Sequence, residues 1–159
     1  MNFLRALPCL AASVFLGAQP AELLPSGGGE LRIGATPYQF RLAKLSTAPP
    51  KAGLPGAVRL EGDLVPPGAA RPFHLVLTVL KDGTLYLMRL ERATPGGYPD
   101  TWAATVKTRT RLIKLEDRPG GRIEIRCEGP LTGIIAKRPQ EAAWSGTLWA
   151  EIPRGDLEH

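Results

Sequence analysis

The sequence predicts an all-β protein: a single antiparallel β-barrel or β-sandwich, a lipocalin-like meander of about seven to ten strands. Two observations predict this fold. Short runs of alternating apolar and polar residues recur along the chain, and breaks rich in proline and glycine separate them at 46–56, 65–72, 81–83, 94–100, 117–121, 129–133 and 137–140. No sustained helical period is present, and residues 140–143 are expected to open one helical turn at most. A chain of 159 residues is expected to form one domain.

Alternation assigns one face of each expected strand to the core. The apolar positions are Tyr38, Phe40 and Leu42; Val58, Leu60 and Leu64; Ile123, Ile125 and Cys127; and Trp144, Leu148, Ala150 and Ile152. Because Cys127 shares the apolar face of its strand, we expect a buried structural thiol rather than a reactive one.

Residues 101–115 begin with a regular alternation that is later lost. Trp102, Ala104 and Val106 are expected to point inward, while Lys107, Arg109 and Arg111 point outward. Leu112 and Ile113 are then adjacent apolar residues, which predicts a β-bulge or a change of strand near Arg111.

Residues 73–91 predict a β-hairpin with a two-residue Asp82-Gly83 loop. This register pairs Lys81 with Thr84 and His74 with Glu91. It predicts a core face and a second face that is apolar near the turn and charged at the open end. The core face comprises Phe73, Leu75, Leu77 and Val79 against Tyr86, Met88 and Leu90; the second comprises His74, Val76, Thr78 and Leu80 against Leu85, Leu87, Arg89 and Glu91.

The N-terminus has the layout of a secretory signal peptide. Arg5 precedes an apolar run over 6–16 and the small residues Gly17 and Ala18, so cleavage is expected after Ala18, with Ala21 as the alternative. A buried N-terminal helix is the other interpretation, and Pro8 counts against it. The expected organisation is a signal peptide (1–18), a flexible lead-in (19–29), a β domain (30–153) and a C-terminal tail (154–159), in a secreted or periplasmic protein.

Cleavage would remove Cys9 and leave Cys127 as the only thiol, so no internal disulfide is expected. No later apolar stretch reaches the roughly 18 residues of a transmembrane segment.

The sequence offers few groups for catalysis. His74 is the only credible histidine, and a surface contact with Glu91 is its simpler interpretation. None of Ser26, Ser46 and Ser145 lies in a G-x-S-x-G motif. Phosphate-binding glycine loops and zinc-ligand sets are also missing. We therefore expect a non-enzymatic protein with no catalytic residues, no cofactor and no metal site.

A net charge of +5 includes a basic strand face at Lys107, Arg109 and Arg111. Such a face is suited to anionic headgroups, cell-wall polymers or an acidic partner, although a solvated outer face is the simpler alternative. Interleaved aromatic residues are missing there, so no nucleic-acid partner is expected.

One segment, "LEGDLVPPGAARPFHLVLTV", resembles a motif of the YceI-like polyisoprenoid-binding family. The matching residues are Gly62, Asp63, Leu64, Gly68, Arg71, Pro72 and Leu75. The resemblance covers about residues 34–130, and the family's early Asp and His-Ser signature is absent. It implies a secreted or periplasmic lipocalin-like barrel that holds a long apolar lipid, with no catalytic residue to carry over.

Two functions are compatible with these observations. The first is binding of an apolar, lipid-like ligand by side chains that include Val76, Leu80, Leu85, Leu87 and Trp149. The alternative is an interaction module of the cell envelope, which would bind a protein or an anionic surface through an apolar patch and the basic strand face.

Overall fold

The computed structural model describes residues 26–154, which form nine β-strands and no helix. The strands are β1 (Ser26–Ile33), β2 (Thr36–Ala48), β3 (Ala57–Val65), β4 (Phe73–Leu80), β5 (Leu85–Arg92), β6 (Asp100–Ala104), β7 (Arg109–Leu115), β8 (Arg122–Ile135) and β9 (Arg138–Glu151). The predicted all-β class is therefore confirmed. The predicted signal peptide and most of the two predicted terminal segments lie outside the described residues.

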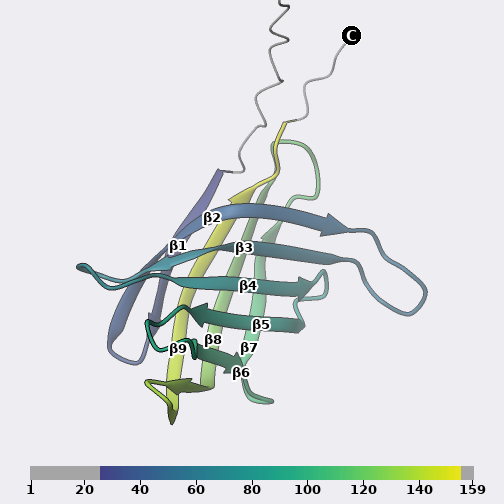
Figure 1. The fold of residues 1–159 in the computed structure, drawn as a ribbon. Coiled ribbons are helices and arrows are strands. Elements are labelled where there is room, and N and C mark those ends of the chain that lie inside the picture. Colours follow the sequence, from purple (N-terminus) through teal and green to yellow (C-terminus); the bar gives the residue numbers. More distant parts are fainter. Residues whose placement is uncertain (1–25, 155–159) are drawn as a thin grey trace, which may run out of the picture.

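Eight of the strands close into an antiparallel barrel, in the order β6-β5-β4-β3-β2-β1-β9-β8, with β6 pairing back to β8. The ninth strand, β7, pairs with the other half of β8. The barrel is flattened, and β2–β6 cross in front of β1, β9, β8 and β7 (Figure 1). The sequence alone did not decide between a barrel and a sandwich. Alternation shows which face of a strand a residue occupies, but not which strands pair to close the sheet.

The buried side chains of the barrel interior come from every strand except β7 and form one hydrophobic cluster, against which Leu112 and Leu115 of β7 pack. Its fully buried large members are Trp144, Phe73, Leu31, Leu60, Leu64, Leu75, Leu77, Leu90, Ile123, Ile125, Leu131 and Leu148. The rings of Tyr38 and Phe73 meet edge to face with their centroids 6.1 Å apart. The predicted core faces of β2, β3, β4, β8 and β9 are confirmed.

Four stretches that the sequence places outside the strands belong to strands instead: 26–29, 129–133, 138–140 of the predicted break at 137–140, and 140–143. Ser26–Gly29 form the first half of β1 and pair with both β2 and β9. Their glycines serve close packing rather than flexibility, because a Cβ at Gly29 would lie 2.2 Å from the Thr147 carbonyl oxygen. Residues 129–133 lie within β8, and residues 140–143 lie within β9 instead of opening a helical turn.

Glycines of the YceI-like segment have structural roles. A Cβ at Gly62 would lie 2.2 Å from the Arg41 carbonyl oxygen and 2.8 Å from the Phe40 ring, so this position excludes a side chain. Gly68 has a φ of 81° in the loop between β3 and β4, a conformation that glycine adopts without strain. Within residues 26–154 there is no helix long and apolar enough to cross a membrane.

Candidate ligand-binding seam

The β4–β5 hairpin has a three-residue loop, not the predicted two-residue one. The Leu80 amide donates to the Thr84 carbonyl and the Gly83 amide to the Leu80 carbonyl. Gly83 has a φ of 92°, as expected where a turn ends in a residue with positive φ. The longer loop shifts the register by one residue, so that Val79 pairs with Leu85.

A β-bulge at Tyr86 restores the predicted register further along β5. Thr78 pairs with Leu87 and His74 with Glu91, as the sequence predicts. The bulge reverses two side chains: Leu85 packs against the core, and Tyr86 is 67% exposed. The predicted inward position of Tyr86 is therefore wrong.

The partner of β5 changes along its length. Residues Arg89–Arg92 pair with β6, but β6 ends at Ala104 and a turn at 105–108 leads into β7. The predicted inward position of Val106 is also wrong, because Val106 lies in this turn and is 90% exposed. No ladder joins β7 to β5 in the described structure. We call this gap between Leu85–Met88 of β5 and Arg109–Leu112 of β7 the seam.

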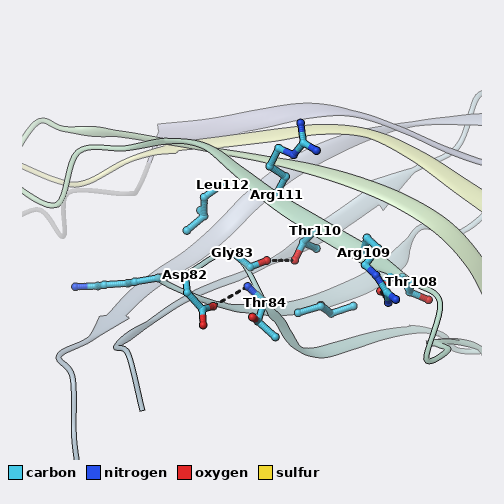
Figure 2. A pocket seen from close by; sticks show the side chains of 10 residues that line it. Asp82, Gly83, Thr84, Thr108, Arg109, Thr110, Arg111 and Leu112 are labelled. Atoms are coloured by element: carbon cyan, nitrogen blue, oxygen red, sulfur yellow. Dashed lines mark hydrogen bonds between the residues drawn. The ribbon is translucent and has the colours of Figure 1, made fainter. Parts of the chain in front are cut away.

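Hydrogen bonds from threonine side chains shape the seam. The Thr108 hydroxyl donates to the Pro130 carbonyl over 2.6 Å and accepts from the Thr105 amide over 2.7 Å, which holds the turn against β8. The Thr110 hydroxyl donates to the Gly83 carbonyl over 2.8 Å and connects β7 to the hairpin loop (Figure 2). This single bond spans a gap that is elsewhere without strand pairing.

A cleft of about 610 Å³ opens to solvent at the seam. It is lined by Lys81, Asp82, Gly83, Thr84, Leu85, Thr108, Arg109, Thr110, Arg111 and Leu112. Leu85 and Leu112 pack against the core and supply its apolar part. Arg109 and Arg111 belong to the exposed face of β7 and form a basic rim on its solvent side. Figure 2 shows Arg109 beside Thr108 and the Arg111 side chain pointing away from the hairpin loop. This volume is in the range of small-molecule sites.

The basic rim has little compensation from carboxylates. Among the ion pairs of residues 26–154, none involves Arg109 or Arg111, and Arg111 lies directly opposite Arg126 in the β7–β8 ladder. Arg109 donates instead to the carbonyls of its own turn, Val106 and Thr108. Because opposed like charges repel each other, a bound anion would reduce the repulsion between Arg111 and Arg126.

Two acidic groups lie near this rim. The Thr84 amide donates to the Asp82 carboxylate over 2.8 Å and holds the pKa of Asp82 below its ordinary value. Glu128 lies opposite Arg109 in the ladder and is 3.9 Å from Arg126. Lys81, at the hairpin end of the cleft, pairs with Asp117.

The predicted binding residues fall into separate groups. Leu85, Arg109 and Arg111 line the seam cleft, whereas Lys107 is exposed in the adjacent turn. Val76 and Leu80 are half-buried on the outer face of β4, and Leu87 is 42% exposed on β5. Trp149 lies away from all of these on β9, where the Arg122 guanidinium stacks on its ring at 4.5 Å. The structure therefore does not gather the predicted apolar residues into one patch.

Sequence reasoning missed Leu112, Thr110 and the hairpin loop as parts of the cleft. Leu112 and Ile113 carried a usable signal, because the predicted bulge occurs there: Leu112 pairs with Ile125 and Lys114 with Glu124. Ile113 is the extra residue and is 51% exposed. The approach of the hairpin loop to β7 is a tertiary contact with no local sequence signal.

His74 and Cys127, the other candidate groups for chemistry, lie in different settings. His74 is about half exposed, and its Nδ1 lies 3.4 Å from Asp63 rather than contacting Glu91, which pairs with Arg89. Cys127 is buried, and burial raises the pKa of its thiol. No group of three or more His, Cys, Asp or Glu side chains within residues 26–154 is placed to hold a metal ion.

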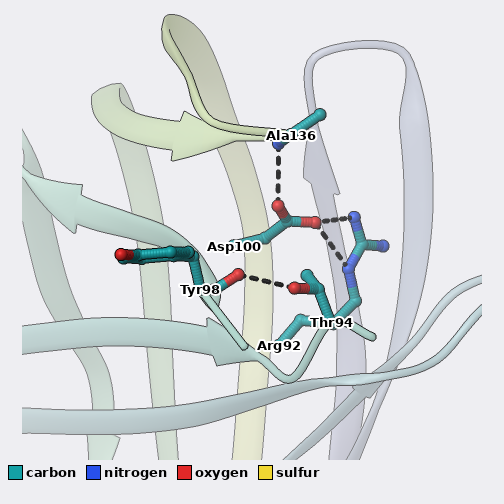
Figure 3. Close-up of polar contacts among 5 residues, drawn as sticks. All are labelled: Arg92, Thr94, Tyr98, Asp100 and Ala136. Atoms are coloured by element: carbon teal, nitrogen blue, oxygen red, sulfur yellow. Dashed lines mark hydrogen bonds and ion pairs between the residues drawn. The ribbon is translucent and has the colours of Figure 1, made fainter. Parts of the chain in front are cut away.

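At the opposite end of β5, a buried ion pair lies where β5 and β6 meet the turn between β8 and β9. Asp100 is 6% exposed, and its carboxylate accepts from the Arg92 guanidinium at 2.6 and 3.1 Å and from the Ala136 amide at 2.8 Å (Figure 3). Arg92 also stacks on the Phe73 ring at 4.3 Å. Burial raises the pKa of Asp100, but the bonds from Ala136 and Arg92 outweigh it, so the pKa lies below its ordinary value. We call this contact the Asp100 latch.

Comparisons of the chain with protein-family models, with curated proteins and with solved structures find no match. The resemblance to the YceI-like family therefore stays a prediction, and the candidate site stands on its own geometry.

Proposed function

We propose that the protein is a non-enzymatic binding protein for an anionic amphiphile, a molecule with a carboxylate or phosphate headgroup and an apolar chain. The observation that carries this proposal is the seam cleft. Its apolar residues, Leu85 and Leu112, adjoin arginines that have no carboxylate partner within residues 26–154. Guanidinium groups form short, charge-assisted hydrogen bonds with carboxylate and phosphate oxygens.

The barrel interior supports a site at the seam rather than in the lumen. A long chain in the lumen would have to displace buried side chains such as Trp144 and Phe73, which are 1% exposed. Protein cores are packed at the density of organic crystals, so displacement would cost much of the stability of the fold. At the seam, the apolar chain of a ligand can contact Leu85 and Leu112 without displacing the core.

The predicted signal peptide and the resemblance to the YceI-like family support a location outside the cytoplasm, where lipids and their anionic breakdown products are available ligands. We therefore place the proposed binding activity in the periplasm or the extracellular space.

Calorimetric titration with dodecyl phosphate, dodecanoate and uncharged dodecanol tests the proposal. We expect the two anions to bind in the seam and the alcohol to bind at least tenfold more weakly, because it lacks the charge that Arg109 and Arg111 recognise. Arg111→Ala should weaken the binding of both anions about tenfold. Arg41→Ala, which removes an exposed arginine from β2 on another part of the barrel, is the matched control and should change nothing.

The apolar contact is tested separately by Leu112→Ser, with Leu45→Ser as its control. Both leucines are partly buried and pack against the core, but only Leu112 lines the cleft. Loss of binding in Leu112→Ser, with unchanged binding in Leu45→Ser, supports the proposal. Equal affinity for dodecanol and dodecyl phosphate, or equal losses in both leucine variants, would refute it.

A further inference from the structure

Each irregularity around the seam turns a large apolar side chain to solvent. The β5 bulge exposes Tyr86 (67%), the turn between β6 and β7 exposes Val106 (90%), and the β7 bulge exposes Ile113 (51%). By contrast, the bulge in β2 between Leu42 and Lys44 exposes only Ala43. Bulges commonly re-aim side chains beside functional sites.

Basic residues lie between Val106 and Ile113 along the chain. Lys107, Arg109 and Arg111 are exposed along the turn and β7, and Arg126 continues the charge onto β8. The acidic groups near this surface are Glu128, near Arg126, and Asp82, on the hairpin side of the cleft. Glu116 and Glu124 lie around Lys114, next to Ile113. No acidic residue occurs from Thr101 to Leu115, so the turn and β7 present only positive charge.

We propose that this surface docks the protein onto an anionic lipid bilayer. It comprises Tyr86, Val106 and Ile113, with Lys107, Arg109 and Arg111, and we call it the docking surface. Exposed apolar side chains enter the headgroup region, and neighbouring lysines and arginines bind the negative surface. The occupant is a membrane rather than a folded partner because single apolar side chains separated by cations are unlike the apolar, charge-depleted core of a protein interface.

The inference extends the proposed function, on which it rests for its biological meaning. Docking would place the mouth of the seam cleft at the headgroup level, where an anionic amphiphile can move laterally between bilayer and cleft. Arg109 and Arg111 belong to both surfaces, whereas Val106 and Lys107 do not line the cleft. Variants at Val106 and Lys107 can therefore test docking without changing the residues that line the cleft.

Vesicle co-sedimentation tests docking. We expect the protein to bind vesicles of phosphatidylglycerol and phosphatidylcholine and not vesicles of phosphatidylcholine alone, with binding that falls as salt rises. Val106→Asp should lower the partition coefficient about tenfold and Lys107→Glu by a similar factor. Ile134→Asp and Arg138→Glu, at exposed positions away from the seam, are the controls and should bind as the wild type does.

Docking and ligand binding fail in distinguishable ways. Val106→Ser, which removes the exposed apolar side chain without placing a carboxylate beside Arg109, should weaken vesicle binding while it keeps its affinity for dodecyl phosphate in solution, because its side chain lies outside the cleft. Equal binding to both kinds of vesicle, or equal loss in Val106→Asp and Ile134→Asp, would overturn docking and leave the proposed ligand binding intact. Vesicle binding without dodecyl phosphate binding would support docking alone.

Discussion

The two halves of β5 show how one strand can be closed at one end and open at the other. Arg89–Arg92 pair with β6 and end at the Asp100 latch, where the Arg92 and Asp100 side chains are only 23% and 9% exposed. Leu85–Met88 lack a second strand partner in the described structure, and one neutral hydrogen bond, from Thr110 to Gly83, spans the seam. Two backbone ladders and a buried ion pair therefore join the strands where the barrel closes, and a single hydrogen bond connects them where we place the ligand.

Asp100→Ala should give the largest change, because it breaks the latch. The substitution leaves the half-buried Arg92 guanidinium without its carboxylate and the Ala136 amide without its acceptor. Breaking such a pair costs roughly 3 kcal/mol of unfolding free energy. Urea unfolding measures the loss.

The matched control for the latch is Glu91→Ala. The Arg89–Glu91 pair lies on the same strand but is 63% and 37% exposed, so its loss should cost less than about 1 kcal/mol. Similar costs for Asp100→Ala and Glu91→Ala would show that the latch does not lock this end of the barrel.

Asp100→Asn should give a smaller, pH-dependent change. It keeps an oxygen acceptor but loses the charge, so we expect a loss of about 1–2 kcal/mol at pH 7. Because the pKa of Asp100 is lowered in the folded protein, its stabilisation is complete above the unfolded value of about 3.9 and is lost as pH falls through the folded value. Unfolding free energies of the two proteins, measured from pH 7 to pH 2.5, should therefore converge at the acidic end.

The comparison with the wild type isolates Asp100 from other acidic groups. Backbone amides that donate to Asp82 and Glu116 lower the pKa of these carboxyls as well, so both proteins should lose stability in acid. A difference between wild type and Asp100→Asn that stays constant down to pH 2.5 would contradict the assignment of the charge to the latch.

The sequence predicted the closed half of β5 better than the open half. Strict alternation in residues 73–79 and 87–91 identified the core face and the pairs His74–Glu91 and Val76–Arg89 correctly. Alternation fails between them, since Leu85, Tyr86 and Leu87 are all apolar and any of them suits the core. The loop length and the bulge then change the register twice, and the two changes cancel.

The candidate site was predicted only in part, because local alternation does not show which distant segments pair. Arg109 and Arg111 could be assigned to the outer face of a strand from local alternation, and the structure places them there. The cleft depends on the absence of pairing between β5 and β7, which involves residues far apart in the chain. Asp100 also gave no local signal, because its partner Arg92 comes from the end of β5 and its partner Ala136 from the turn between β8 and β9.

Thr110→Val should give the smallest change in stability and the most direct measure of the seam. Valine keeps the shape of threonine but cannot donate to the Gly83 carbonyl, so we expect a loss of about 1 kcal/mol in local stability. Cys127 is a suitable reporter because it pairs with Thr110 in the β7–β8 ladder and is fully buried. A Cys9→Ser background leaves it as the only thiol.

If the seam opens locally, a thiol reagent should modify Cys127 faster than global unfolding allows, because local opening costs less free energy than complete unfolding. The rate should rise about fivefold in Thr110→Val, which corresponds to the lost hydrogen bond. Thr132→Val, at an exposed position on β8, should leave the rate unchanged. Saturating dodecyl phosphate should slow modification in the wild type, because a ligand bound between β5 and β7 favours the closed seam. Modification at the global unfolding rate in both proteins would mean that one hydrogen bond and the flanking core hold the seam as firmly as the latch holds the other end.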